Sequence, residues 1–584
     1  MAKLSKLILS VLFFLSTFLP GLSGLIDTVS ISLTGMPYYT LVTSSGFLDD
    51  ITDSSIIQLD ENAGYVKNIL LVFVDRDASL LERYHAVKSI GGVFVGYLEP
   101  ANLFIVRAEF DGPEEMNTLC ESLMQKDSVL FASGSYAFKN EDDFTPNDPF
   151  DGLNEGRDVW DETNARGGTW WLEAIDARNA WGYSPYFNAV KVGIVDSGFD
   201  TAHPDLAGKI TFPSNMLAKQ NIPGAHGTHV AGIIGANGNN GIGISGITQN
   251  STLVCVDWQA EEGQLWVSDL RIVFGVGYAV KAGAKVVNLS VGSSSNVPEG
   301  KPAYPKLWMD AEGALVSAYM SILFNRGFDF VVVQSAGNGD SKGNPIDAFN
   351  NGSFTCITRE NCMSALFGVP AEAVLGRIII AGSARTLGNG NFIQSGFSNV
   401  GDQVSICAPG SSLFSCTTAE NGSYQYMSGT SMAAPVVTGV ASLVWSVNPE
   451  LTGLQVKSIV CDEANTRYNV PETNDKFWVS VPYRSYRMVN AQLAVEAAVK
   501  TLYDTCTVTG RAVDGNGNPK DCEITAVSDG RTFRFSSGLD GTFRFLLPPG
   551  AIQLTFEAPG PLQAQTAFDT AENETMALGD VALI

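Results

Sequence analysis

Hydrophobic and polar positions form three different patterns along the chain, and each pattern predicts a different kind of domain. Between about residues 65 and 138, apolar stretches of strand length and helical stretches follow the order strand, helix, strand, strand, helix, strand. From 166 to 502, near-continuous runs of Val and Ile, such as AVKVGIVDS and DFVVVQSAG, end in Gly or Ser and alternate with helices. From 503 to 584, short alternating strands are separated by DG and NG turns.

These patterns predict a fold class for each unit. The first order of elements is typical of a ferredoxin-like α+β fold. Apolar strands that alternate with helices predict an α/β domain on a parallel sheet, with ligands beyond the carboxyl ends of the strands. Period-2 strands joined by tight turns predict a small all-β sandwich. Residues 139–165 are acidic and have no apolar period, which indicates a surface linker after the first unit.

The first 24 residues have the composition of a secretory signal peptide. Lys3 and Lys6 precede an uncharged apolar run, Leu7–Leu19, and small residues such as Gly21 and Gly24 follow. The run is shorter than the ~20 residues that a membrane-spanning helix needs. We therefore expect removal of residues 1–24, a secreted protein, and no membrane span afterwards.

The charge balance narrows the possible partners. The chain has 61 Asp and Glu against 36 Lys and Arg, which gives a formal net charge of −25. A nucleic-acid partner would need a basic patch, so this balance argues against nucleic acid. The acidic composition is otherwise that of a soluble exported protein.

Nine cysteines are present, and an exported chain can oxidise them. Pairs that are close in sequence could form disulfide bonds, although sequence does not fix the connectivity. These pairs are Cys356/Cys362, Cys407/Cys416 and Cys506/Cys522. Because no CxxC pair occurs, a zinc site or a thioredoxin-type site is not expected. Cys255 lies in the apolar run STLVCVDW, which predicts a buried thiol.

Three motifs carry side chains that can act together in nucleophilic catalysis. Asp196 ends the strand VKVGIVDS, His226 begins HGTHVAGIIGA, and Ser431 lies in SGTSMAAPVV before a long apolar stretch. A serine hydroxyl becomes a nucleophile when a neutral imidazole takes its proton, and a buried carboxylate fixes the tautomer of that imidazole. Taken singly, each residue has an ordinary structural explanation, such as a turn aspartate or an N-cap serine. The chain supplies one of each in the order Asp, His, Ser.

In these motifs and their order, the sequence resembles the subtilisin-like serine peptidase family over roughly residues 165–500. The resemblance implies that Asp196 orients the imidazole, that His226 is the general base and then the acid, and that Ser431 is the nucleophile. It also implies that Asn338, in FVVVQSAGNGD, donates a hydrogen bond to the oxyanion together with the backbone N–H of Ser431.

The resemblance further implies a peptide-binding strand and a possible structural calcium ion. Ser290, Val291 and Gly292, in NLSVGSS, would pair with an extended substrate through main-chain hydrogen bonds. Calcium would lie between Asp205 and the loop 237–246. Its ligands would be the carboxylate of Asp205, the side-chain oxygen of Asn240, and the carbonyls of Gly238, Ile242 and Ile244. The alternative is an Asn- and Gly-rich turn without an ion.

The two flanking units also fit this resemblance. Residues 25–138, ferredoxin-like from about 65, would be a propeptide that inhibits the enzyme until the chain cuts itself near 135–145. Residues 503–584 resemble a carboxypeptidase-regulatory-like β-sandwich, which would be an accessory domain.

The sequence thus predicts a secreted serine endopeptidase, made as a self-processed zymogen, that hydrolyses peptides or proteins through an acyl-enzyme. Its partners would be these substrates and its own propeptide. No cofactor is expected for catalysis, since the chain has only four histidines and no HExxH spacing. Two alternatives remain. One is an inactive subtilase fold used for binding, and the other is a surface adhesion protein acting through its C-terminal sandwich.

Overall fold

The protein is described by a computed structural model that covers most of the chain after its first 55 residues. The described residues are 56–58, 63–75, 78, 80–98, 103–139, 169–213, 221–238, 240, 243–258, 266–294, 306–388, 391–421, 423–472, 484–559 and 562–584. The signal-peptide prediction for residues 1–24, and the linker prediction beyond Lys139, lie outside these residues.

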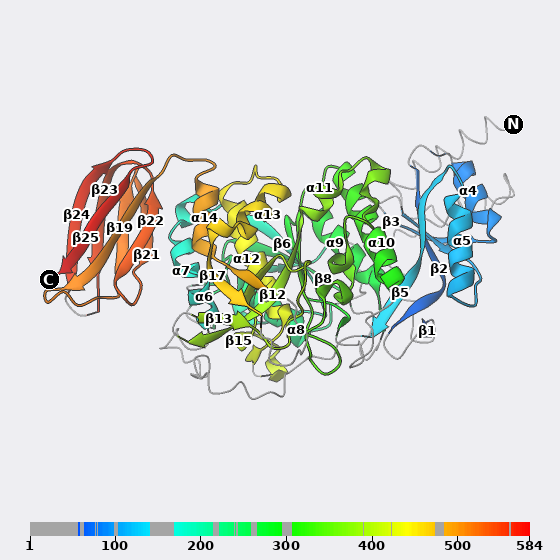
Figure 1. Cartoon of the computed structure of the whole chain (residues 1–584), viewed down its shortest axis with the longest axis horizontal. Coiled ribbons are helices and arrows are strands. Elements are labelled where there is room, and N and C mark those ends of the chain that lie inside the picture. The colour runs from blue at the N-terminus through cyan, green and yellow to red at the C-terminus, as the bar shows by residue number, and fades with distance from the viewer. Residues whose placement is uncertain are drawn as a thin grey trace. The chain divides into compact units, whose positions relative to one another are not determined.

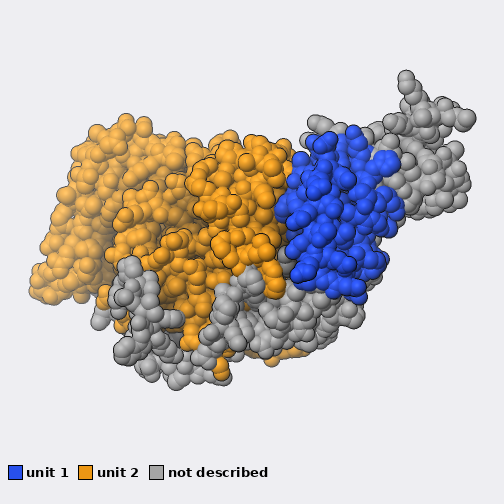
Figure 2. Space-filling model, turned by 45° about the vertical axis from the view of Figure 1, so that its right-hand side comes forward, with its two compact units in different colours: residues 1–138, 264–270 blue, residues 139–263, 271–584 orange. Residues whose placement is uncertain are grey.

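The chain divides into two compact units, which Figure 2 shows in two colours. The first consists of Met1–Phe138 together with Gln264–Leu270, and the second of Lys139–Gly263 together with Arg271–Ile584. The second unit therefore contains both the predicted α/β domain and the predicted sandwich.

The first unit has the predicted ferredoxin-like order of elements. Its described sheet has the strand order β3-β4-β2-β5-β9, with β1 added beside β2. The strands are β1 (Ile56–Gln58), β2 (Ala63–Val74), β3 (Val93–Leu98), β4 (Leu103–Arg107), β5 (Val129–Lys139) and β9 (Trp266–Ser268). The helices are α4 (Leu80–Ser89) and α5 (Pro113–Met124). Helix α5 begins with Pro at a first-turn position and buries Met116, Cys120 and Leu123 at helical spacing.

The second unit is built on a ten-stranded sheet that is mostly parallel (Figure 1). The strand order is β17-β18-β14-β12-β11-β10-β6-β8-β7, with β13 beside β12. The strands are β6 (Val190–Asp196), β7 (Ile210–Thr211), β8 (Ser251–Asp257), β10 (Val286–Leu289), β11 (Val331–Ser335), β12 (Ile378–Gly388), β13 (Asn391–Gln394), β14 (Ile406–Pro409), β17 (Thr466–Pro471) and β18 (Ser485–Val489). Every residue of β10 and β11 is buried, as the apolar runs predict for strands covered on both faces.

Helices surround this sheet, and a short hairpin stands apart from it. The helices are α6 (Trp170–Ala174), α7 (Ala177–Trp181), α8 (Ala225–Gly235), α9 (Asp269–Lys281), α10 (Lys306–Asn325), α11 (Ala371–Leu375), α12 (Thr430–Val447), α13 (Gly453–Cys461) and α14 (Ala491–Val499). The hairpin pairs β15 (Leu413–Cys416) with β16 (Tyr424–Met427). Helix α12 packs against α8, α14 and the central strands. It is long and apolar enough to cross a membrane, but all of its residues are buried, so it serves here as a core helix.

The C-terminal part is the predicted all-β sandwich. Its two sheets have the orders β22-β19-β25 and β21-β20-β23-β24. The strands are β19 (Cys506–Asp514), β20 (Glu523–Ser528), β21 (Arg531–Ser536), β22 (Thr542–Leu547), β23 (Gly550–Glu557), β24 (Gln563–Thr570) and β25 (Thr575–Leu583). Phe535 and Phe545 stack between the sheets with ring centroids 4.3 Å apart. Together the three parts confirm the predicted fold class.

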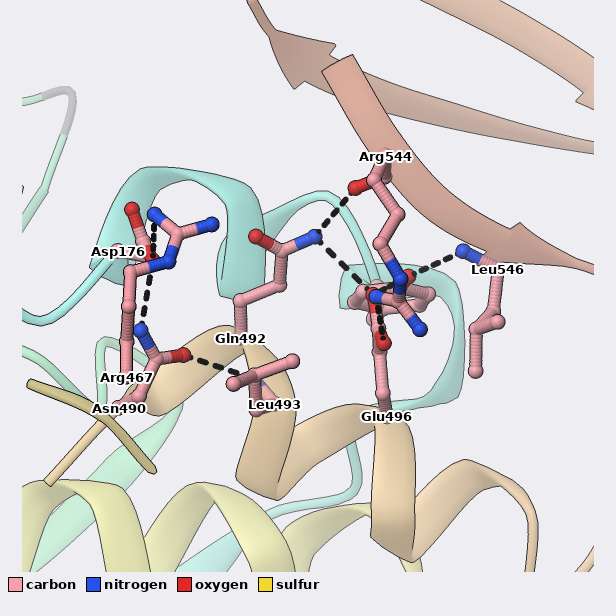
Figure 3. Close-up of polar contacts among 9 residues, drawn as sticks. Asp176, Arg467, Asn490, Gln492, Leu493, Glu496, Arg544 and Leu546 are labelled. Atoms are coloured by element: carbon pink, nitrogen blue, oxygen red, sulfur yellow. Dashed lines mark hydrogen bonds and ion pairs between the residues drawn. The ribbon is translucent and has the colours of Figure 1, made fainter. Parts of the chain in front are cut away.

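The sandwich is joined to the α/β part by a buried polar network, part of which Figure 3 shows. The Glu496 carboxylate of α14 is 2% exposed. It accepts hydrogen bonds from the Tyr183 hydroxyl (2.9 Å) and from Gln492 Nε2 (3.0 Å), and it pairs with Arg544 Nη1 of β22 (2.6 Å). The Tyr183 oxygen in turn accepts the backbone N–H of Leu546 at 2.8 Å. Three segments, residues 177–186, α14 and β22, therefore meet at one carboxylate.

The suggested disulfide bonds are not confirmed: all nine cysteines are free thiols in the structure. Cys407 lies in β14 of the central sheet, whereas Cys416 lies in β15 of the separate hairpin. Cys356 donates to the carbonyl of Ser353 instead of meeting Cys362. Burial raises the pKa of the Cys255 thiol well above its ordinary value, which supports the expectation of an unreactive buried thiol.

Candidate active site

Asp196 and His226 are brought together where strand β6 ends and helix α8 begins. Asp196 is the last residue of β6 and is 1% exposed. His226 lies in the first turn of α8, and its Nδ1 is 2.7 Å from Asp196 Oδ1. The same oxygen accepts the backbone N–H of Ser197 at 2.7 Å. A buried carboxylate in this position fixes the imidazole with Nδ1 protonated and leaves Nε2 as the basic nitrogen.

Glycines allow α8 to approach the end of β6 this closely. A Cβ at Gly224 would lie 1.8 Å from the carbonyl oxygen of Ser197, and one at Gly227 would lie 2.2 Å from that of Gly198. A side chain at either position would therefore push the helix, and His226 with it, away from Asp196. The small residues that surround His226 in the sequence have this structural role.

The neighbouring His229 is a structural residue. It is fully buried, and its Nε2 donates to the carbonyls of Leu413 (3.0 Å) and Gln425 (3.2 Å), one on each strand of the β15–β16 hairpin. Burial, followed by the nearby His226, lowers the pKa of His229 to about 3. The neutral imidazole, shared between these two carbonyls, holds α8 against the hairpin.

Ser431 lies in the first turn of α12 and is hydrogen-bonded to the segment that follows strand β10. The residue is 9% exposed. Its carbonyl oxygen accepts a hydrogen bond from the Ser290 hydroxyl at 2.7 Å. Ser290 follows β10, and β10 pairs with β6 in a register that sets Leu289 beside Val195. Neighbouring parallel strands lie about 4.8 Å apart. His226 is thus held at the end of β6 through Asp196, and Ser431 is held at the end of the adjacent strand β10 through Ser290. The helices that carry them, α8 and α12, pack against each other.

Asn338 presents one end of its amide to the start of α12. Its Oδ1 accepts the backbone N–H of Thr430 (2.8 Å) and the Thr430 hydroxyl (2.9 Å). The position that a Cβ on Gly429 would take lies 3.3 Å from Asn338 Nδ2 and 3.5 Å from the backbone nitrogen of Ser431. Asn338 Nδ2 and the Ser431 backbone nitrogen therefore border the same small space beside Gly429.

The three residues predicted to bind substrate differ in what they offer. The Val291 carbonyl accepts from Gln334 Nε2 (3.2 Å) and Ser335 Oγ (3.1 Å), so it points into the protein. No described residue hydrogen-bonds to the backbone of Gly292. Main-chain groups alternate in direction along an extended strand. The side chain of Ser290, by contrast, is engaged in its hydrogen bond to the Ser431 carbonyl.

Two of the residues predicted to bind calcium, Asp205 and Asn240, contact each other in the structure. Asp205 is fully buried, and its Oδ2 accepts the backbone N–H of Ile244 at 2.7 Å and the Tyr424 hydroxyl at 3.4 Å. Its Oδ1 accepts Asn240 Nδ2 at 2.6 Å, so Asn240 turns a donor toward it rather than an oxygen. Calcium requires six to eight converging oxygens. Gly238 lies in a turn whose Cβ position faces Gln249, and Ile242 lies outside the described residues.

Several residues that shape this site were not assigned a role from sequence. Thr430 fixes the orientation of the Asn338 amide, and Asn288 Nδ2 donates to Ser290 Oγ at 3.0 Å. Thr430 lies in the same motif as Ser431, SGTSMAAPVV, and Asn288 lies in the same motif as Ser290, NLSVGSS. Their side-chain partners are distant in sequence, however, and only the fold brings them together.

The chain is similar in sequence to known serine proteinases. The sequence profile of the Subtilase family matches residues 188–479, half of the chain. The chain is 26% identical to a thermophilic serine proteinase of Bacillus sp. (strain AK1) over 474 residues, which are 80% of this chain and 97% of that relative. It is 30% identical to thermitase of Thermoactinomyces vulgaris over 358 residues, which are 60% of this chain and 100% of thermitase.

A solved structure shares the fold. The crystal structure of fervidolysin from Fervidobacterium pennivorans matches with a TM-score of 0.52 at 20% identity and covers 90% of this chain and 79% of that chain. The fold and the sequence relatives together define a serine endopeptidase of the subtilisin type. The chain belongs to the subtilase family.

Proposed function

We propose that this serine endopeptidase is secreted, is made as a self-processed zymogen, and cleaves peptide bonds with Asp196, His226 and Ser431 as its catalytic triad. The contact between the buried Asp196 carboxylate and His226 Nδ1, 2.7 Å, is the observation that carries this assignment. No second function is favoured by a specific contact, and the binding-protein and adhesion alternatives are not taken further.

The proposed reaction begins when the Ser431 hydroxyl attacks the carbonyl carbon of the scissile bond. His226 Nε2 takes the hydroxyl proton as the C–O bond forms, and Asp196 stabilises the imidazolium. The oxyanion of the tetrahedral intermediate accepts hydrogen bonds from Asn338 Nδ2 and the Ser431 N–H. The intermediate collapses, His226 gives its proton to the leaving amine, and the acyl-enzyme remains. Water, deprotonated by His226, then attacks the acyl carbon and releases the second product.

Proposed self-inhibition rests on the strand that ends the first unit. Strand β5 reaches Lys139, and within that unit it pairs with β9, a segment that comes from the middle of the peptidase sequence and leads directly into α9. An N-terminal unit joined in this way would inhibit the enzyme until the chain is cut after β5.

A serine-directed fluorophosphonate probe tests the catalytic assignment. We expect the processed wild-type protein to be labelled at Ser431, Ser431→Ala to remain unlabelled and uncut, and Ser442→Ala to behave as wild type. Ser442 is a matched control because it is a buried serine of the same helix. Absence of labelling in processed wild type would rule out the triad. Normal maturation of pure Ser431→Ala, without added protease, would rule out self-processing.

The N-terminus of the protein recovered from the culture medium tests the other two parts of the proposal. We expect mass spectrometry to find a mature chain in the medium that has lost both residues 1–24 and the ferredoxin-like unit. Retention of the whole precursor inside the cell would argue against secretion.

A further inference from the structure

The helix that carries Ser431 has a gap in its own hydrogen bonds. In an α-helix each backbone N–H donates to the carbonyl four residues earlier. Position 435 of α12 is proline, which has no N–H. The carbonyl four residues before Pro435 is that of Ser431. The carbonyl oxygen of Ser431, the proposed nucleophile, therefore lacks the hydrogen bond that a backbone N–H at position 435 would normally donate.

The hydroxyl of Ser290 occupies this gap. It donates to the Ser431 carbonyl at 2.7 Å, and both residues are largely buried, at 6% and 9% exposure. Water has little access there, so the hydroxyl is the donor that satisfies a carbonyl which the proline leaves open. A buried carbonyl without a partner is costly, which makes this contact a strong constraint.

The hydroxyl of Ser290 is itself held in place by α12. Asn288 Nδ2 donates to Ser290 Oγ at 3.0 Å, and Asn288 Oδ1 accepts from the Thr438 hydroxyl at 3.0 Å. Thr438 lies seven residues after Ser431, two turns along the same face of the helix. The end of β10 thus binds α12 at two points and closes a ring of buried hydrogen bonds through Ser431.

We propose that Ser290 is a positioning residue of the peptidase, and that its hydroxyl takes the place of the missing helical donor of Pro435 and fixes Ser431 relative to the substrate strand. This inference rests on the proposed role of Ser431 as nucleophile. Because Ser290 begins the predicted peptide-binding segment, one residue then anchors both the substrate backbone and the nucleophile. A misplacement of reacting groups by about 1 Å lowers the rate about 100-fold.

A double-mutant cycle between Ser290 and Pro435 tests this role. Ser290→Ala removes the substitute donor, and Pro435→Ala restores the helical one. We expect Ser290→Ala to slow fluorophosphonate labelling of Ser431 about 10- to 100-fold, Pro435→Ala alone to change it little, and the double variant to recover most of the loss. Labelling is a suitable readout because it measures the reactivity of Ser431 without peptide pairing at Gly292. The rate of self-processing of the full chain gives a second measure.

Two further comparisons separate positioning from folding. Ser290→Thr and Ser290→Val have nearly the same shape, and only the first keeps a hydroxyl, so we expect faster labelling in the threonine variant at equal melting temperature. Ser442→Ala removes a hydroxyl that donates to the Thr438 carbonyl inside the same helix, and it should label as wild type.

The outcomes test the positioning role of Ser290 separately from the proposed peptidase function. Additive effects in the double variant, or equal labelling of Ser290→Thr and Ser290→Val, would overturn the positioning role. Absence of labelling in wild type would instead overturn the proposed function.

Discussion

Replacing Arg544 by alanine tests whether the sandwich is a structural part of the peptidase. The substitution removes the partner of the Glu496 carboxylate, which is 2% exposed, and leaves that charge with only the hydrogen bonds from Tyr183 and Gln492. Loss of one partner of a fully buried ion pair costs about 3–5 kcal/mol. Arg544 itself is 42% exposed. Water can therefore reach part of the gap, and we expect a loss of about 2 kcal/mol.

The sandwich offers a matched control for this substitution. Arg511 is 40% exposed, but its partner Asp580 is 59% exposed and 4.0 Å away. Exposed pairs of this kind contribute about 0.2–1 kcal/mol. Arg511→Ala should therefore cost much less than Arg544→Ala, although both remove one arginine from the same small domain.

Urea unfolding of the enzyme, inhibited to prevent autolysis and followed by tryptophan fluorescence, measures the two losses. Trp181 lies at the end of α7, two residues before Tyr183, and so reports on the joint. If Arg544→Ala loses no more free energy of unfolding than Arg511→Ala, the Glu496 network does not stabilise the attachment of the sandwich.

Further predictions concern the site itself. Removing one oxyanion-hole donor lowers kcat about 10²- to 10³-fold in a subtilisin, and we take over the same order for Asn338→Leu, with a small change in KM, measured on a peptide substrate. Gly429→Ala should also lower kcat, because its Cβ would lie 3.3 Å from Asn338 Nδ2; unchanged kinetics would place the oxyanion elsewhere. Burial lowers the pKa of His229 from 6.5 to about 3, so the unfolded chain binds a proton below about pH 6.5 that the folded chain does not. Stability should thus fall progressively as the pH drops from about 6.5 toward 3, and His229→Gln should reduce this slope in urea titrations at several pH values.

The fold class and the contact between Asp196 and His226 could be predicted from the sequence, because these depend on local pattern. Asp196, His226 and Ser431 each lie in a contiguous motif at the end of a strand or the start of a helix, and such positions follow from the order of elements. The contact between Ser290 and Ser431 joins residues 141 apart, and the contact between Tyr183 and Glu496 joins residues 313 apart. No local pattern specifies such partners.

Closeness in sequence was misleading for the cysteines, for a related reason. Cys407 and Cys416 are only nine residues apart, but the turn between them takes the chain from the central sheet to the β15–β16 hairpin. Short separation permits a disulfide without bringing the two sulfur atoms together, since the geometry of the bond requires Cα atoms within about 7 Å and converging side chains.

Pro435 gives the buried core helix α12 an open backbone carbonyl at Ser431. Proline in a helix interior costs about 3 kcal/mol relative to alanine. Helix α12 tolerates this cost because all of its residues are buried against α8, α14 and the sheet. The proline leaves the Ser431 carbonyl open to a donor from outside the helix, and the donor comes from the strand beside β6, whose last residue is Asp196. With alanine at position 435 the helix could itself donate to this carbonyl, which is why the double variant should recover most of the labelling that Ser290→Ala loses.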